Sequence, residues 1–284
     1  MNKKAVLIVS FGTIDIDALK KSIESMENSF KAAFSEYAVR RAFTSPAVIE
    51  KLAKQSGIEI DEVGAALKKL AAEGYEEVYV QPLYIVADKM YDFIRQYVTE
   101  LNHSRKVFKK IKIGRPLLSY LGTKNTPDDF MIVLEAVRTT IPELGSEKAV
   151  VFMCNGTQQF EYSVLQLKLN EAGIKNAFVY TADGFPSFEA VLRQLKDAKA
   201  KEVILAPFVL VGSGHLMNYL AGESEDSIKS KLESEDYTVT VHRSGLGENP
   251  AIQAIFIQHL KDAFAGKTAN HEREKREQLM VQIK

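Results

Sequence analysis

A histidine stands behind two glycines in Val211-Gly212-Ser213-Gly214-His215, at the end of a long apolar run. Two glycines at that place end a strand, so the following side chain is expected at an open edge and not in a core. A neutral imidazole can bind a transition metal or take up a proton near neutral pH. His215 is therefore the first candidate for chemistry.

Two more polar residues follow apolar runs in the same half of the chain. Asp183 comes shortly after Ala177–Thr181, and Asn155 follows Cys154 at the end of another run. A carboxylate and an amide carbonyl are both oxygen ligands for a divalent metal. An acid after a strand also commonly caps a helix, and this second interpretation of Asp183 stays open. With His215, these residues indicate a divalent-metal site.

Three short patterns occur twice, in the same order, and predict an internal duplication. The pairs are Lys4–Thr13 with Lys148–Thr157, Glu77–Val86 with Glu202–Val211, and Ile113–Arg115 with Val241–Arg243. Two similar halves that face each other form a cleft, and differences between equivalent positions indicate where function lies. By this alignment Met90 is the counterpart of His215.

Apolar runs and helical spacings alternate along the chain, which is typical of parallel sheets with helices on both faces. The expected strands are Ala5–Ser10, Val78–Val86, Lys110–Ile113, Val150–Met153, Ala177–Thr181, Val203–Val211 and Tyr237–His242. The expected helices are Asp17–Phe34, Ser45–Leu52, Asp61–Glu73, Asp88–Leu101, Thr126–Thr140, Phe160–Ala172, Phe188–Leu195, one from Gly214, and Asn249–Gly266. We predict two similar α/β domains, residues 1–144 and 145–266, and a charged tail, 267–284.

Small residues at the predicted strand ends are candidates for binding a substrate. Ligands of open parallel sheets bind beyond the carboxyl ends of the strands, where backbone N–H groups before a helix can hold an anion. A Gly-Thr pair there can also be a simple turn. The candidates are Ser10, Gly12, Thr13, Met90, Gly156 and Gly214.

Composition restricts the class of protein. The 284 residues are 46% hydrophobic and 26% charged, with a formal net charge of zero, so no basic field for nucleic acid exists. The single cysteine, Cys154, excludes an internal disulfide and a cysteine-rich zinc site. No apolar run reaches the roughly 18 residues of a membrane span. We expect a cytoplasmic protein without nucleic-acid or membrane partners, and leave homo-oligomers open.

Several segments together resemble the anaerobic sirohydrochlorin cobaltochelatases, which are class II tetrapyrrole chelatases. They are Val9–Thr13, Arg41–Ser45, Ala71–Tyr75, Val151–Met153, Leu210–His215 and above all Ser244-Gly245-Leu246-Gly247-Glu248-Asn249-Pro250-Ala251-Ile252. The resemblance implies two similar α/β domains with the tetrapyrrole in the cleft between them. It also implies that His215 matches a family histidine, that Asp183 replaces a family glutamate and that Asn155 replaces a second histidine.

The expected activity is insertion of Co²⁺, or of Ni²⁺ or Fe²⁺, into sirohydrochlorin for anaerobic cobalamin and porphyrin-related biosynthesis. His215 and Asp183 would be catalytic, and together with Asn155 would hold the metal substrate. The alternative is a former chelatase that binds a tetrapyrrole such as haem, or removes its iron, because Asn155 cannot take a proton. In that protein His215 and Met90 would be the axial ligands of the haem iron.

Overall fold

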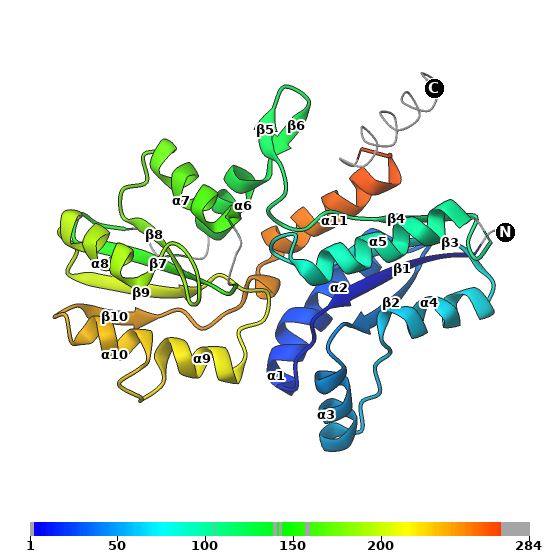
Figure 1. Ribbon diagram of the computed structural model, residues 1–284, viewed down its shortest axis with the longest axis horizontal. Coiled ribbons are helices and arrows are strands. Elements are labelled where there is room, and N and C mark those ends of the chain that lie inside the picture. Colours follow the sequence, from blue (N-terminus) through cyan, green and yellow to red (C-terminus); the bar gives the residue numbers. More distant parts are fainter. Residues whose placement is uncertain (1–2, 105, 139–140, 142–143, 157–159, 268–284) are drawn as a thin grey trace. The chain divides into compact units, whose positions relative to one another are not determined.

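The computed structural model describes residues 3–104, 106–138, 141, 144–156 and 160–267, which form two compact units (Figure 1). Unit 1 comprises Met1–Gly12, Glu27–Leu117 and Ala254–Lys284, and unit 2 comprises Thr13–Met26 and Leu118–Gln253. Within the described ranges, no helix has the length and apolar character needed to cross a bilayer.

Unit 1 is built on a parallel sheet of four strands in the order β2-β1-β3-β4, which are labelled in Figure 1. The strands are β1 (Lys3–Ser10), β2 (Ala38–Phe43), β3 (Tyr75–Pro82) and β4 (Lys110–Ile113). The helices of this unit are α2 (Ser25–Ala33), whose first two residues lie in unit 2, α3 (Pro46–Ser56), α4 (Val63–Ala72) and α5 (Lys89–Ser104). Apolar residues of α4 and α5 pack with β1 and β3 in one core cluster, so these helices cover one face.

Unit 2 has a second parallel sheet, in the order β10-β9-β7-β8. Its strands are β7 (Lys148–Cys154), β8 (Ala177–Thr181), β9 (Glu202–Pro207) and β10 (Thr238–Val241). Its helices include α6 (Asp129–Arg138), α7 (Glu161–Glu171), α8 (Phe188–Asp197), α9 (Gly214–Ala221) and α10 (Ile228–Glu233). The last three of these share a core cluster with the sheet.

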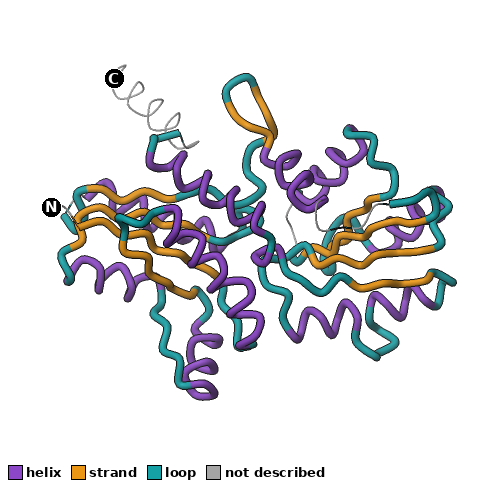
Figure 2. The backbone as a smooth tube through the Cα atoms, turned by 180° about the vertical axis from the view of Figure 1, so that it is seen from behind, coloured by secondary structure: helices purple, strands orange, loops and turns teal. Residues whose placement is uncertain are grey.

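The remaining elements are short, apart from the last helix. They are α1 (Ile16–Ala18), the π-helical η1 (Leu19–Glu24), the 3₁₀ turn η2 (Leu246–Glu248) and α11 (Pro250–Phe264). A hairpin of β5 (Leu121–Thr123) and β6 (Thr126–Asp128) projects beside α6 (Figures 1 and 2).

The two sheets have the same plan, which confirms the predicted duplication. Replacing β1, β2, β3 and β4 by β7, β8, β9 and β10 turns the first strand order into β8-β7-β9-β10. This is the order of the second sheet, read from its other edge. The helices after the second central strands start at Lys89 and Gly214, at the same offset as the repeated sequence. Residues 90 and 215 are therefore the second residues of equivalent helices.

Backbone hydrogen bonds at the carboxyl edges of the sheets repeat the equivalence. The amide of Leu83 donates to the carbonyl of Val9 over 2.7 Å, and Phe208 donates to Met153 over 2.7 Å. In the same way Gly114 donates to Val80 and His242 donates to Leu205, each over 2.8 Å. The weak third sequence echo, at Ile113–Arg115 and Val241–Arg243, therefore marks equivalent strand ends.

Several predicted elements differ from the observed ones. The expected strands Val78–Val86 and Val203–Val211 end at Pro82 and Pro207, after which the chain stays buried without extending the sheet. The helix expected from Thr126 begins at Asp129, because Thr126–Asp128 forms β6 and the Asp128 carboxylate accepts a bond from the Met131 amide over 3.1 Å. Strand β2, the hairpin and α10 were not predicted.

Each unit contains more than one stretch of chain. Residues 13–26 belong to unit 2, and the chain returns to unit 1 at Ala254, inside α11. The domain limits 1–144, 145–266 and 267–284 describe continuous stretches of sequence and stay a prediction. The tail from residue 268 lies outside the described residues.

Candidate functional site

The three residues predicted to hold a metal all follow strands of the unit 2 sheet. Asn155 comes directly after β7, Asp183 lies in the turn after β8, and His215 lies in the first turn of α9, after β9. These three strands are neighbours, and all are parallel. The topology therefore brings the three positions to one edge of one sheet.

Asn155 has an exposed side chain, and its backbone carbonyl accepts a hydrogen bond of 3.1 Å from the Tyr162 hydroxyl. The next residue, Gly156, has φ +145°, a conformation that L side chains rarely adopt. Cys154 lies beneath them, and complete burial raises the pKa of its thiol well above the usual value. Because metals bind the thiolate, Cys154 is poorly suited to be a ligand.

Asp183 is exposed in the turn between β8 and α8. The alternative role of Asp183 as a helix cap is filled by another residue, since the Ser187 side chain accepts a bond of 3.4 Å from the Ala190 amide at the start of α8. The Asp183 carboxylate is thus not needed to begin the helix, and it lies at the carboxyl edge of the sheet.

His215 belongs to α9, but its side chain lies outside what the structure describes. The loop before α9 is held closely by backbone contacts. A Cβ atom on Gly212 would lie 3.0 Å from the carbonyl oxygen of Arg243, and one on Gly245 would lie 2.6 Å from the Gly212 nitrogen. The two glycines therefore allow the loops after β9 and β10 to approach each other and set where α9 begins.

Among the side chains that the structure describes, no group of three or more His, Cys, Asp or Glu residues could hold a metal ion. The predicted set contains only one such described side chain, because Asn155 is an amide and the side chain of His215 is not described. The metal site formed by His215, Asp183 and Asn155 therefore stays a prediction.

The unit 1 strand end carries Ser10 and Gly12, and Thr13 begins unit 2. Ser10 is buried, and its hydroxyl has no hydrogen-bond partner. Gly12 has φ +92°, and a Cβ atom there would lie 2.5 Å from the Phe43 ring. The Thr13 hydroxyl, also buried, accepts a bond of 3.1 Å from the Asp15 amide. Their part in substrate binding stays a prediction.

Met90, the counterpart of His215, is half-buried and packs against the core cluster of unit 1. Its helix α5 is capped by Asp88, whose carboxylate accepts a bond of 2.8 Å from the Tyr91 amide. Burial raises the pKa of Asp88, although backbone hydrogen bonds oppose the rise. Both residues have structural roles in this unit. Gly156 and Gly214 lie at the unit 2 edge, and Gly214 is exposed.

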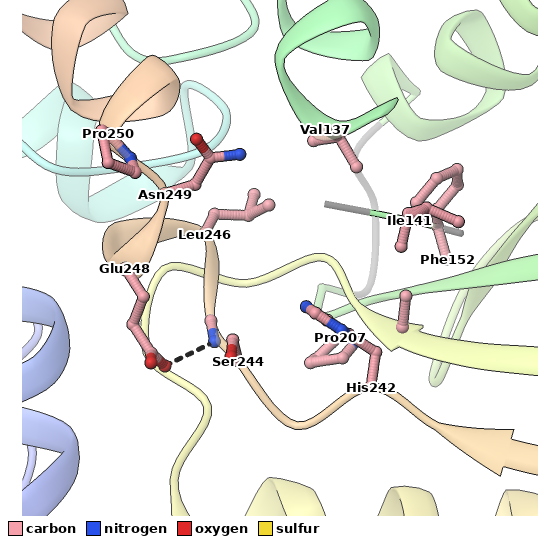
Figure 3. Close-up of a pocket in the computed structure, with 12 residues that line it drawn as sticks. Val137, Ile141, Phe152, Pro207, His242, Ser244, Leu246, Glu248, Asn249 and Pro250 are labelled. Carbon is pink, nitrogen blue, oxygen red and sulfur yellow. Dashed lines mark hydrogen bonds between the residues drawn. The ribbon is translucent and has the colours of Figure 1, made fainter. Parts of the chain in front are cut away.

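A cavity of about 240 Å³ opens beside the ends of β7, β9 and β10 in unit 2 (Figure 3). Residues of the stretch Ser244–Pro250 form much of its wall. Two of the polar side chains there are already paired: the Glu248 carboxylate accepts from the Gly245 amide over 2.9 Å, and the Asn249 amide donates to the Ala136 carbonyl over 3.0 Å. The cavity is smaller than the roughly 300–1,000 Å³ of typical ligand pockets.

Two phenylalanine rings that follow Asn155 and Asp183 closely in the chain are exposed, and no sequence pattern indicated this. Phe160 is 76% exposed directly before α7, and Phe185 is 67% exposed after β8. The Ser163 hydroxyl of α7 donates to the Phe185 carbonyl over 3.4 Å, so both belong to the same part of unit 2. Exposed aromatic rings beside polar groups suit a large flat ligand.

The model of the cobalt chelatase family named CbiK matches residues 4–265. The chain belongs to this family. It is 35% identical to the sirohydrochlorin cobaltochelatase of Salmonella typhimurium over 263 residues, covering 92% of this chain and 96% of that protein. It is 26% identical to the sirohydrochlorin cobaltochelatase CbiKC of Nitratidesulfovibrio vulgaris, covering 93% of this chain and 91% of that protein. The resemblance found in the sequence is confirmed.

Solved structures agree with the family fold. SirB from Bacillus subtilis with Fe³⁺ has a TM-score of 0.64 at 17% identity, and the match covers 95% of this chain and 97% of that one. DR2241 from Deinococcus radiodurans, described as similar to chelatases, has a TM-score of 0.60 at 13% identity, covering 92% of this chain and 55% of that one. The predicted class II chelatase fold is thus also confirmed.

Proposed function

We propose that this cobalt chelatase family member inserts Co²⁺ into sirohydrochlorin. The observation that carries the proposal is the match to the family over residues 4–265, together with a 35% identical relative named for this reaction. The chain covers almost the whole of that relative. A divalent cobalt ion is then the metal substrate, and the tetrapyrrole is its acceptor.

The chemistry assigns different work to the three residues at the unit 2 edge. An incoming metal displaces two pyrrole N–H protons, so the site needs groups that bind the ion and groups that accept protons. Asp183 supplies an exposed carboxylate. His215 supplies an imidazole that can serve as ligand and base in turn. Asn155 supplies a carbonyl oxygen but no base.

The exposed aromatic rings at this edge are suited to contact a flat substrate. Phe160 and Phe185 offer exposed apolar faces, while Asn155 and Asp183 are exposed polar groups. A macrocycle placed on such a surface keeps its ring against phenylalanine faces and its centre near the metal-binding groups. The cytoplasmic location and any homo-oligomer stay predictions.

The direct test is metal insertion by the purified full-length chain. Sirohydrochlorin would be incubated with Co²⁺, Ni²⁺ or Fe²⁺, with and without protein, and the visible spectrum followed over time. We expect protein-dependent conversion that is fastest with Co²⁺. Conversion no faster than without protein for all three metals would overturn the proposal, and a faster reaction with another metal would change the assigned substrate.

A further inference from the structure

Two tyrosines are joined by a short hydrogen bond behind the unit 2 edge. The hydroxyls of Tyr180, in β8, and Tyr219, in α9, lie 2.6 Å apart. Tyr180 is buried, and its ring packs edge-on against Phe188 with the ring centres 5.8 Å apart. Tyr219 is half-buried against the same core cluster. The bond therefore links a strand that is fixed in the sheet to a helix on its face.

Each tyrosine is close in the chain to a predicted metal-binding residue. Tyr219 lies one helical turn after His215 in α9, and Tyr180 lies three residues before Asp183. Burial raises the pKa of the Tyr180 phenol, and the bond to Tyr219 and the negative charge of Asp183 add to the rise. The phenol therefore stays neutral, and its hydroxyl keeps the hydrogen bond to Tyr219.

Backbone contacts hold the loop before α9, but no described side chain caps the start of this helix. Its N-cap residue, Ser213, makes no side-chain capping bond, and Gly214 is exposed without a close neighbour to a Cβ atom. By contrast, the equivalent helix α5 is capped by the Asp88 carboxylate. The Tyr180–Tyr219 hydrogen bond provides a side-chain link from the body of α9 to β8.

The duplicated half shows that the fold does not require this pair. Strand register pairs Val9 with Ala42 in unit 1 and Met153 with Tyr180 in unit 2, so Ala42 is the counterpart of Tyr180. The counterpart of Tyr219, at the offset that relates α5 to α9, is Ile94. Ala42 and Ile94 are both fully buried in one apolar cluster. An apolar pair therefore suffices to pack a helix on this sheet.

We infer that Tyr180 and Tyr219 are positioning residues that fix the helix carrying His215 against the turn carrying Asp183. This rests on the proposed function, in which those two residues hold the metal substrate. Residues that orient metal ligands without touching the metal typically change metal affinity or activity by about 10–100-fold when they are mutated. In unit 2 the two hydroxyls take the place of the apolar pair Ala42 and Ile94 of unit 1. They do so between the two elements that carry the proposed ligands His215 and Asp183.

The test uses Tyr180→Phe, Tyr219→Phe and the double variant in the full-length protein. Tyr237→Phe is the matched control, because Tyr237 is a buried tyrosine of the same cluster at the opposite end of the sheet. Co²⁺ binding without tetrapyrrole would be followed by visible absorption, and insertion by the KM for Co²⁺ and for sirohydrochlorin. Thermal unfolding would be measured for all variants.

We expect each single variant to weaken Co²⁺ binding and raise the KM for Co²⁺ by about tenfold, with the KM for sirohydrochlorin unchanged. The double variant should match the singles, because both remove one bond. Unchanged Co²⁺ affinity in the variants, a loss equal to that of Tyr237→Phe, or a wild type that does not bind Co²⁺ would overturn the inference. A wild type that binds Co²⁺ through Asp183 but inserts none would instead overturn the proposed function, and the binding data would still decide the role of the pair.

Discussion

The two units share one plan but differ in the residues at the carboxyl edges of their sheets. Unit 1 has Met90 packed on its core, whereas the equivalent position in unit 2 is His215. Directly after the first central strand, unit 1 has exposed Phe11 and unit 2 has exposed Asn155. At these positions unit 1 has two apolar side chains, whereas unit 2 has an imidazole and an amide. If the proposed metal site is correct, the two edges differ in function as well as in sequence, and exchanging residues between them tests this difference.

The largest effect is expected when the two halves are made alike at the histidine. His215→Met should lower cobalt insertion by at least about 100-fold, since it removes a ligand and a base. Insertion rates and thermal unfolding should be measured for His215→Met and for the double variant His215→Met with Met90→His, which places the imidazole in unit 1 in place of unit 2. We expect Met90→His not to restore activity in the double variant. Full activity of His215→Met would show that the halves do not differ in function at this position.

A smaller loss is expected at the acidic residue. Asp183→Ala should reduce insertion and Co²⁺ affinity by about 10–100-fold, the usual range for groups around a metal. Asp183→Glu keeps an oxygen ligand and should retain most of the activity. Titration with Co²⁺ and measured insertion rates would check both variants. Equal activity of the alanine and glutamate variants would remove Asp183 from the proposed site.

A substitution at Asn155 is expected to increase activity, whereas those at His215 and Asp183 decrease it. Asn155→His adds an imidazole at the unit 2 edge and should raise the insertion rate or Co²⁺ affinity by up to about tenfold, equivalent to about 1.4 kcal/mol. Side-by-side rates for wild type and variant would test this. Asn155→Gln serves as a control that keeps the amide. A wild type that is faster than Asn155→His would assign a positive role to the amide.

The smallest effect concerns the stability of unit 1. Burial raises the pKa of Asp88 in the folded protein, so the charge of Asp88 lowers stability as pH rises through its folded value. Asn is an equally good helix cap. Asp88→Asn should therefore raise the free energy of unfolding at pH 7, by less than about 1 kcal/mol after allowance for solvent screening.

This gain should disappear in acid, below the ordinary aspartate pKa of about 3.9, where both states bind the proton. Denaturant unfolding at pH 7 and pH 3 would measure it. Ser213→Ala in unit 2 is the matched control, because Ser213 occupies the equivalent cap position without a capping bond. If Asp88→Asn changed the free energy of unfolding equally at pH 7 and pH 3, the charge of Asp88 would not be the cause.

The fold was largely predictable because the apolar runs and repeated motifs in the sequence coincide with the central strands. Strand β2 was missed because Arg40 and Arg41 interrupt its apolar character, and the structure pairs Arg41 with the Glu27 carboxylate over 2.8 Å. The ends of β3 and β9 were misjudged because hydrophobicity continues past Pro82 and Pro207 into buried loops. Hydrophobicity reports burial, whereas the end of a strand depends on hydrogen bonding.

The candidate site was predictable only in part. The positions of Asn155 and Asp183 at one sheet edge could be predicted, because parallel topology brings strand ends together. The pairing of Tyr180 with Tyr219 was not predictable, since both tyrosines fit an apolar core pattern and lie 39 residues apart. The exposure of Phe160 and Phe185 likewise depends on packing that a sequence pattern does not report.

Helix α11 has a consequence for the evolution of this chain. It begins in unit 2 at Pro250 and continues into unit 1 from Ala254. There its Phe264 ring packs with Phe34 and Tyr79, at ring-centre distances of 5.2 and 3.8 Å. A gene cut at the midpoint would produce a first fragment that lacks this apolar seal. Each unit contains chain from both halves of the sequence, so we expect that neither half folds fully by itself.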